Sequence, residues 1–245
     1  MNRIAVWLRL LALLSCAHSL IPAAYALAAE TNDAADPDPA RFEPEIAAFE
    51  AWDRQNSFPR EAVLFVGSSS IRMWPTAESF PDFPVVNRGF GGSHISDVNY
   101  FAERIVLKYS PRLIVFYAGD NDVEAGKSPQ QVFDDFQDFA ELVNNNLPKT
   151  CIVYLPIKPS IARWRKWSQI QAVNSSVAKL AQSDERIIYV DTATPMLGGD
   201  GKPRAELFLD DGLHLNAKGY NEWSDKLGPL LRQAMNPMAP LNSSR

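Results

Sequence analysis

Short apolar runs alternate along this chain with longer amphipathic stretches. The runs are rich in β-branched residues and do not alternate with polar ones, which is typical of strands buried on both faces of a parallel sheet. Strands are predicted at residues 62–66, 84–86, 113–117, 151–157 and 187–190. Apolar residues recur at helical spacing between and around these runs. Helices are predicted at residues 42–58, 95–108, 129–145, 164–183 and 217–235, the last behind Asn216 as its N-cap.

This alternation of strands and helices predicts one three-layer α/β domain over residues 42–237. Residues 29–41 are small, acidic and interrupted by prolines, so they are expected to form a flexible leader. Residues 238–245 are assigned to a C-terminal tail. In a parallel sheet of this kind, ligands bind beyond the carboxyl ends of the strands. The residues that follow each strand are therefore the first place to look for chemistry.

The first 28 residues have the pattern of a secretory signal peptide. Arg3 and Arg9 form a basic start, an apolar run covers residues 10–21, and cleavage is expected after Ala28. The expected location is then periplasmic or secreted. Two alternatives stay open: a lipoprotein anchored at Cys16, whose surroundings loosely match a lipobox, and an uncleaved membrane anchor. After residue 28, no stretch is long and apolar enough to span a bilayer.

Composition changes this picture only by exclusion. The 245 residues are 46% hydrophobic and 22% charged, which excludes disorder as the main state. The formal net charge is −5 and there is no basic stripe, so a nucleic-acid partner is not expected. Cleavage of the signal peptide leaves Cys151 as the single cysteine, and an intrachain disulfide is then impossible.

Polar, glycine-rich loops follow three of the predicted strands. They are residues 67–70, 87–94 and 119–122. Cleavage also leaves two histidines, His94 and His214. Asp211 lies three residues before His214, close enough for its carboxylate to orient the imidazole as a catalytic base requires. Such a pair is also common as a plain turn contact, so the spacing by itself decides little.

A serine nucleophile needs such a base, because its hydroxyl reacts poorly while protonated. Ser68, Ser69 and Ser70 follow the first strand, and spacing does not choose among them; all three could instead cap a helix. Acyl transfer also needs donors for the developing oxyanion. The Gly92 N–H, the Asn121 amide and the Ser69 N–H are the candidates, against the alternatives of a glycine turn and an Asx turn.

Taken together, these segments resemble the four blocks of the SGNH (GDSL-type) hydrolases. The matching residues, in chain order, are Gly67-Ser68-Ser69, Gly92, Gly119-Asp120-Asn121-Asp122 and Asp211-Gly212-Leu213-His214. The resemblance implies that Ser69 is the nucleophile and that Asp211 and His214 complete its triad. It also implies an oxyanion hole of Ser69, Gly92 and Asn121, and a flavodoxin-like α/β/α sandwich of about five parallel strands in order 2-1-3-4-5.

One departure from the family pattern narrows the resemblance. The first block usually reads Gly-Asp-Ser, and this chain has Ser68 in place of the aspartate. A start of this kind is similar to the branch that includes the platelet-activating-factor acetylhydrolase subunits. The segments Ile157-Lys158-Pro159-Ser160 and Arg163-Trp164 also look like the bacterial members of that branch.

Four further side chains are candidates for substrate contact: Phe90, His94, Trp74 and Trp164. His94 is also the rival base, since it lies two residues after Gly92, and the three aromatic residues could instead belong to the core. A metal site is not expected. The loop aspartates more readily accept backbone N–H bonds, and two histidines with one cysteine make a zinc site improbable. Cys151 is interpreted as a small core residue.

The predicted function is therefore a serine ester hydrolase that uses no metal or organic cofactor. Its expected substrates are small-molecule or carbohydrate esters with short acyl groups, with no nucleic-acid partner and no stable membrane span in the mature form. Two other functions stay open. The same triad could transfer an acyl group to or from a carbohydrate, or the chain could be a non-catalytic carbohydrate- or ligand-binding module.

Overall fold

The computed structural model describes residues 34–235. The predicted signal peptide with Cys16, the start of the predicted leader and the predicted C-terminal tail lie outside the described residues, so they stay predictions. The described part of the leader is held by ion pairs: Asp36 contacts Lys127, and Arg41 contacts Asp97 at 2.5 Å.

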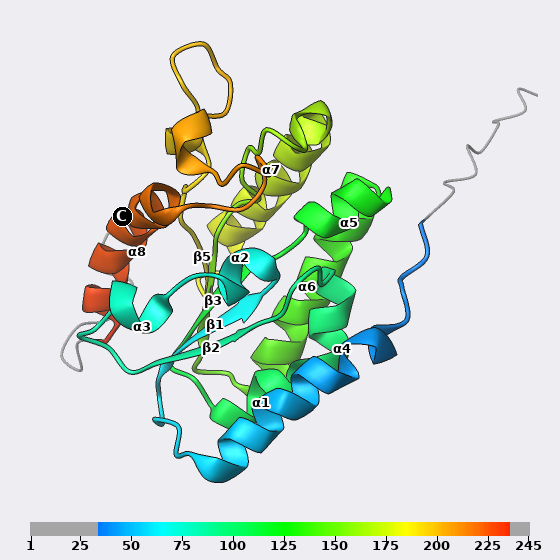
Figure 1. The fold of residues 1–245 in the computed structure, drawn as a ribbon. Coiled ribbons are helices and arrows are strands. Elements are labelled where there is room, and N and C mark those ends of the chain that lie inside the picture. The colour runs from blue at the N-terminus through cyan, green and yellow to red at the C-terminus, as the bar shows by residue number, and fades with distance from the viewer. Residues whose placement is uncertain (1–33, 236–245) are drawn as a thin grey trace, which may run out of the picture. The chain divides into compact units, whose positions relative to one another are not determined.

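A five-stranded parallel sheet forms the middle of the fold, with strand order β2-β1-β3-β4-β5 (Figure 1). The predicted fold class and strand order are confirmed. The strands are β1 (Val63–Gly67), β2 (Val85–Gly89), β3 (Leu113–Tyr117), β4 (Cys151–Tyr154) and β5 (Ile187–Tyr189). Every residue of β1 and β3 is buried, as expected for central strands covered on both faces.

Two strands differ in length from the sequence prediction. β4 ends at Tyr154 instead of residue 157, and Pro156 follows, which has no N–H to donate to a ladder. β2 continues to Gly89 because its polar residues have partners inside the protein. Asn87 donates to the Ile71 carbonyl at 2.8 Å, and Arg88 pairs with Asp53 at 2.6 Å.

Eight α-helices surround the sheet in the described part of the chain. They are α1 (Glu43–Gln55), α2 (Ser69–Arg72), α3 (Thr76–Ser79), α4 (Ile95–Ile105), α5 (Asp120–Ala125), α6 (Pro129–Asn146), α7 (Trp167–Ser183) and α8 (Ala217–Met235). Three are shorter than predicted. α1 ends at Gln55 instead of residue 58, and 3-10 turns at Leu107–Tyr109 and Trp164–Lys166 replace the end of α4 and the start of α7. Asn216 caps α8 as expected, accepting the Lys218 N–H at 2.9 Å.

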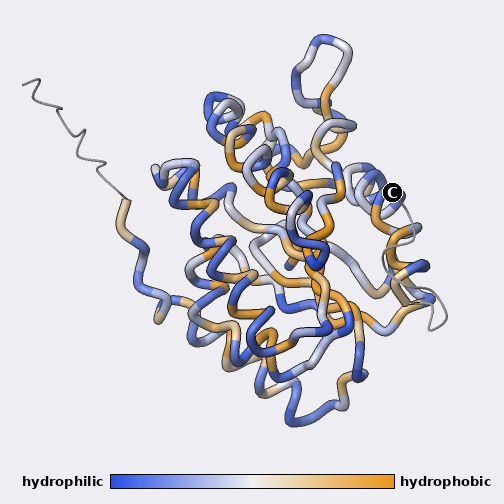
Figure 2. Tube along the Cα trace, turned by 180° about the vertical axis from the view of Figure 1, so that it is seen from behind, coloured by the Kyte–Doolittle hydropathy of each residue, from blue (hydrophilic) through white to orange (hydrophobic). Residues whose placement is uncertain are grey.

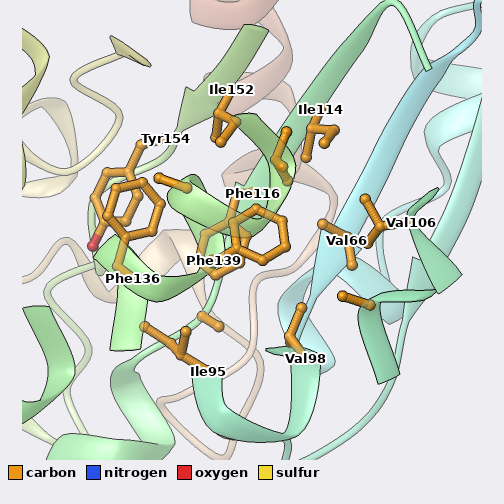
Figure 3. Close-up of a cluster of buried hydrophobic side chains, with 14 of the residues drawn as sticks. Val66, Ile95, Val98, Val106, Ile114, Phe116, Phe136, Phe139, Ile152 and Tyr154 are labelled. Carbon is orange, nitrogen blue, oxygen red and sulfur yellow. The ribbon is translucent and has the colours of Figure 1, made fainter. Parts of the chain in front are cut away.

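Two apolar cores, one on each face of the sheet, hold the layers together. One face packs against α1, α4, α6 and α7; there Phe116 of β3 meets Phe136 and Phe139 of α6 (Figure 3). The other face packs against α2, α3 and α8, whose Trp223 contacts Tyr117 of β3. The hydropathy view shows the same arrangement, with apolar segments inside and polar ones on the outer helices (Figure 2). Within residues 34–235, no helix is both long and apolar enough to cross a bilayer.

Candidate active site

The chain makes a sharp turn at the carboxyl end of β1 and begins α2 at Ser69. Gly67 has a φ of 139°, and a Cβ at this position would lie 1.8 Å from the Tyr117 carbonyl oxygen, so only glycine fits. Of the three serines that follow, Ser68 and Ser70 are fully buried and Ser69 is partly exposed. Ser69 is thus the serine that a molecule from solvent can reach.

Ser69 lies against the turn that precedes α8. Its Oγ is 3.0 Å from His214 Nε2, and His214 Nδ1 is 2.5 Å from Asp211 Oδ2. The two residues of this turn are three positions apart, and Ser69 lies 145 positions earlier in the chain. The structure therefore brings together the three predicted triad residues in a continuous hydrogen-bonded chain.

The Asp211 carboxylate is fixed by donors from its own turn. Its Oδ1 accepts the backbone N–H groups of Leu213 at 2.8 Å and His214 at 2.9 Å. Partial burial acts to raise the pKa of Asp211, but the bonds from the His214 ring and these two N–H groups outweigh it and lower the pKa to about 2. Asp211 is therefore ionised at neutral pH, as a group that steadies an imidazolium must be.

The three predicted oxyanion donors have different surroundings. The Ser69 N–H is at the first position of α2, where helix geometry leaves an amide without an intrahelical partner. Gly92 is exposed with a φ of 81°, and a Cβ there would meet nothing within 4 Å, so there is room beside its backbone. Asn121, in α5, donates one amide N–H to the Ser93 carbonyl at 3.0 Å. A primary amide carries two N–H groups, so one is left for an oxyanion.

A buried group of charges lies next to Asn121. Asp120 is within 3.2 Å of the Lys158 ammonium and within 3.0 Å of the Arg163 guanidinium. Lys158 also donates to Ser70 Oγ and to the Tyr117 hydroxyl, both at 2.9 Å. Burial acts to raise the pKa of Asp120, and the two cations hold it below its ordinary value. The sequence analysis noted Lys158 and Arg163 only as parts of family-like segments and did not predict their contact with Asp120. A lysine inside an apolar run was the feature that could have indicated a buried ion pair.

His94 does not take the place of the base. It precedes α4, and its backbone N–H donates to Asp97 at 2.8 Å. Its ring is buried, with Nδ1 3.8 Å from Asp122, whereas His214 contacts Ser69. Burial first, and then the charge of Lys127, lower the pKa of His94 to about 4, so this ring is neutral at physiological pH.

Two of the predicted substrate contacts are wrong. Phe90 is fully buried between Phe42 and Phe101, and Trp74 is 2% exposed, with its ring stacked on Tyr220. Both aromatic side chains fill the core because its apolar packing removes them from water. Trp164 remains a candidate, since it is only half-buried, stacked on Trp167 with ring centroids 5.6 Å apart.

Two other potentially reactive side chains, Cys151 and Asp122, have contacts that fit a structural role. Cys151 begins β4 half-buried, and burial raises the pKa of its thiol, which keeps it in the unreactive protonated form. Asp122, in α5, accepts the Ile95 N–H at 3.1 Å, as expected from the sequence. Among residues 34–235, no group of three or more His, Cys, Asp or Glu side chains is arranged to hold a metal ion.

The chain also matches a protein-family model. The model of the GDSL-like lipase/acylhydrolase family matches residues 72–221, which is more than half of the chain. No curated protein matches the sequence.

Solved structures share the fold at low sequence identity. A Streptococcus pneumonia protein provisionally named a platelet activating factor superposes with a TM-score of 0.70 at 22% identity, covering 78% of this chain and 94% of that one. A GDSL-like lipase from Bacteroides thetaiotaomicron gives 0.65 at 23% identity, covering 81% and 98%. An acetyl xylan esterase gives 0.58 at 20% identity, covering 68% and 98%. At these identities the likeness is one of fold.

Proposed function

Because the chain belongs to the GDSL-like lipase/acylhydrolase family and is a carboxylic ester hydrolase, we propose that Ser69, His214 and Asp211 form its catalytic triad and act on short acyl esters. The observation that carries the proposal is the unbroken line of contacts from Ser69 Oγ through the His214 ring to the Asp211 carboxylate, at 3.0 and 2.5 Å. A plain turn contact between Asp211 and His214 would not need a serine hydroxyl on the far ring nitrogen.

In the first half of the proposed cycle, His214 Nε2 takes the Ser69 proton while Oγ attacks the ester carbonyl. Asp211 accepts the Nδ1–H bond and stabilises the imidazolium that forms. The tetrahedral intermediate collapses when His214 gives its proton to the leaving alkoxide. Ser69 is left as an acyl ester, and the alcohol departs.

In the second half, water takes the position of the alcohol. His214 removes a proton from this water, which attacks the acyl carbonyl, and then returns the proton to Ser69 Oγ. The carboxylic acid leaves and the enzyme is restored. In both halves the oxyanion is bound by the N–H groups of Ser69 and Gly92 and by the Asn121 amide. Each such donor is worth roughly 2.7–4 kcal/mol in the transition state.

The proposed substrates are esters that combine a short acyl group with an alcohol of any bulk, including a sugar. Ser69 is partly exposed, and Gly92 and Asp211 are exposed, so a bulky alcohol can stay outside while its ester group reaches the nucleophile. The neighbours of similar fold include an acetyl xylan esterase and a mutant of an acetyl esterase with an acetate ion, which supports an acetyl-sized acyl group.

We also propose that the enzyme is exported, periplasmic or secreted, on the basis of Arg3, Arg9 and the apolar run at residues 10–21. Esters on extracellular polysaccharide would then be accessible to it. Mass spectrometry of the exported protein distinguishes cleavage after Ala28 from lipid attachment at Cys16.

The test of this function is substitution of Ser69 by alanine in the mature protein. Ser69→Ala should lower hydrolysis of p-nitrophenyl acetate by roughly 10⁴-fold or more without changing the circular dichroism spectrum. A fluorophosphonate probe should label the wild type at Ser69 and leave this variant unlabelled. Ser168→Ala, at an exposed serine of α7, is the matched control and should keep full activity. Activity in Ser69→Ala close to that of the wild type would refute the assignment.

Two additions to the assay resolve the finer parts of the proposal. The rate should fall as the acyl chain of the p-nitrophenyl ester lengthens, and a preference for long chains would refute the acetyl-sized site. Product analysis with and without a sugar acceptor separates hydrolysis from acyl transfer, because an acylated sugar forms only in the second case.

A further inference from the structure

The segment that follows β4 brings a largely buried arginine to the oxygen end of the Asn121 amide, whose nitrogen end faces the Ser93 carbonyl. Arg163 Nη2 donates to Asn121 Oδ1 at 2.8 Å, and Nη1 lies 3.0 Å from Asp120 Oδ2. The Arg163 side chain is 12% exposed. One guanidinium thus holds two consecutive residues at the start of α5.

This contact determines which way the Asn121 amide faces. An asparagine amide can turn over and exchange its oxygen with its nitrogen at little cost unless its neighbours distinguish the two. Here Oδ1 faces a guanidinium, which only donates, and Nδ2 faces the Ser93 carbonyl, which only accepts. Both partners favour the orientation that keeps an N–H available for an oxyanion.

The same contact increases the donor strength of that N–H. A charge-assisted bond to the amide oxygen polarises the amide and makes its N–H groups more positive. Beside it, two cations, Lys158 and Arg163, face the single carboxylate of Asp120, so the group has a net positive charge within a buried region. A positive charge behind an oxyanion donor stabilises the negative charge that develops in the transition state.

The Arg163 segment is also tied to the triad turn. The N–H of the preceding Ala162 donates to the Gly212 carbonyl at 3.0 Å, between Asp211 and His214. One short segment therefore contacts both the turn that carries the base and the helix that carries the oxyanion amide.

From these contacts we infer that Arg163 is a positioning residue for the oxyanion hole: it orients and polarises the Asn121 amide, and it acts on the reaction through Asn121. The inference rests on the proposed ester hydrolysis. Arg163 touches no reacting atom in this role, so its effect should appear in kcat and should depend on the presence of Asn121.

The experiment is a double-mutant cycle between Arg163→Met and Asn121→Ala, measured with p-nitrophenyl acetate. Arg163→Met is expected to lower kcat by roughly 10- to 100-fold, and the upper end of this range equals the effect of losing one oxyanion donor. KM should change by less than about threefold. In the Asn121→Ala background the same substitution should cost less than about threefold, because the group it acts through is already gone. Arg163→Lys, which keeps the charge and loses the planar fork, should fall between the wild type and Arg163→Met.

Two controls make the outcomes distinct. Arg165→Met removes an exposed arginine that lies two positions after Arg163 and pairs with Glu124. This variant should leave kcat unchanged. Fluorophosphonate titration counts the folded, reactive sites in each preparation. If Arg163→Met does not fold, Arg163→Lys carries the cycle instead.

Equal losses with and without Asn121 would overturn the inference, as would a rise in KM at constant kcat, which would mean that Arg163 binds the substrate directly. An unchanged kcat in a folded Arg163→Met variant would overturn it too. Failure of the proposed function itself looks different, because Ser69→Ala would then remain active and no variant would be labelled at Ser69.

Discussion

Two turns at the carboxyl edge of the sheet each carry an aspartate: Asp211 in the turn before α8, and Asp120 at the start of α5. The two aspartates differ in their exposure and in where their partners come from. The side chain of Asp211 is 47% exposed, and its partners come from its own turn, within three residues. Asp120 is 5% exposed, and its cationic partners, Lys158 and Arg163, come from another part of the chain. One turn is local and open, and the other is long-range and buried.

The difference follows the work that each turn is proposed to do. The base must exchange protons with substrate and water in every cycle, which a partly exposed His214 supported by short local bonds can do. The oxyanion amide of Asn121 must keep one orientation throughout the reaction, which a buried network provides at lower mobility. Substitutions in the turn of Asp211 should therefore lower mainly activity, and substitutions around Asp120 should lower mainly stability.

The largest expected effect is on activity at the open turn. His214→Gln should lower kcat/KM for p-nitrophenyl acetate by roughly 10⁴-fold or more, because no base remains for Ser69. The melting temperature should change by less than about 2 °C, since the turn keeps its backbone bonds to Asp211. Activity assays and thermal unfolding of the same preparation measure both.

The control is Asp210→Asn, at the exposed residue beside Asp211, which should keep both activity and stability. A His214→Gln variant that loses activity together with its fold would contradict the view that this turn contributes little to stability. Retained activity within about tenfold of the wild type would contradict the role of His214 as base.

The open turn was also the part of the site that sequence could predict. The contact between Asp211 and His214 is local, so their spacing in the sequence was enough to predict it. Ser69, Gly92 and Asn121 were predicted from the family-like blocks. The strands were recognisable by their apolar runs, although the pattern did not include the polar Asn87 and Arg88 at the end of β2. What separates Ser69 from Ser68 and Ser70 is burial, which depends on how α2 packs and which no spacing expresses.

The buried turn was not predictable for a physical reason. Lys158 lies 38 positions from Asp120, and Arg163 lies 42 positions from Asn121, so their contacts exist only once β3 and β4 are adjacent. The same limit explains the errors at Phe90 and Trp74. An aromatic residue beside a predicted site has the same sequence pattern whether it lines a pocket or fills the core.

The second prediction tests the buried turn through Lys158, whose side chain is 1% exposed. Lys158→Met should lower the free energy of unfolding by roughly 3 kcal/mol, because Asp120 and the Ser70 and Tyr117 hydroxyls lose a buried partner. Arg163 still neutralises Asp120, which keeps the loss at the lower end of the range for broken buried pairs. The melting temperature should fall by roughly 6–12 °C.

Thermal unfolding of Lys179→Met provides the matched control, since Lys179 is an exposed lysine on α7 and its loss should be nearly neutral. An unchanged melting temperature in Lys158→Met would mean that the cost of desolvating the ammonium equals the stabilisation from its contacts. The contrast between the two turns would then lie in exposure and not in stability.

The smallest expected effect is a change in how stability depends on pH, and it compares Asp211 with the buried Asp122. Burial raises the pKa of Asp122 to about 7, so the folded protein keeps a proton there that the unfolded chain releases near 3.8, the ordinary pKa of an aspartate. This contribution to stability is present at low pH and is lost as the pH rises through about 7. The contribution of His94 has the opposite sign, because its pKa of about 4 in the folded protein lies below 6.5, the ordinary value of a histidine.

Between about pH 4 and 6.5 the contributions of Asp122 and His94 have opposite slopes and largely cancel. Asp122→Asn removes one of them and leaves His94, whose pKa is lowered mainly by burial and by Lys127. The stability of this variant should then rise with pH across the interval, by about 1 kcal/mol or more in urea unfolding.

Asp211→Asn should behave differently over the same interval. With a pKa of about 2, Asp211 contributes stability that is complete above about pH 4 and is lost only as the pH falls toward 2. The slope of the Asp211→Asn profile should therefore stay close to that of the wild type, and the slope of the Asp122→Asn profile should be more positive. Parallel profiles for both variants would mean that Asp122 is ionised in the folded protein, held so by the Lys127 ammonium 3.4 Å away in spite of its burial. In that case the pKa values of the two carboxylates would depend on the strength of their hydrogen-bond and ion-pair partners and not on their exposure.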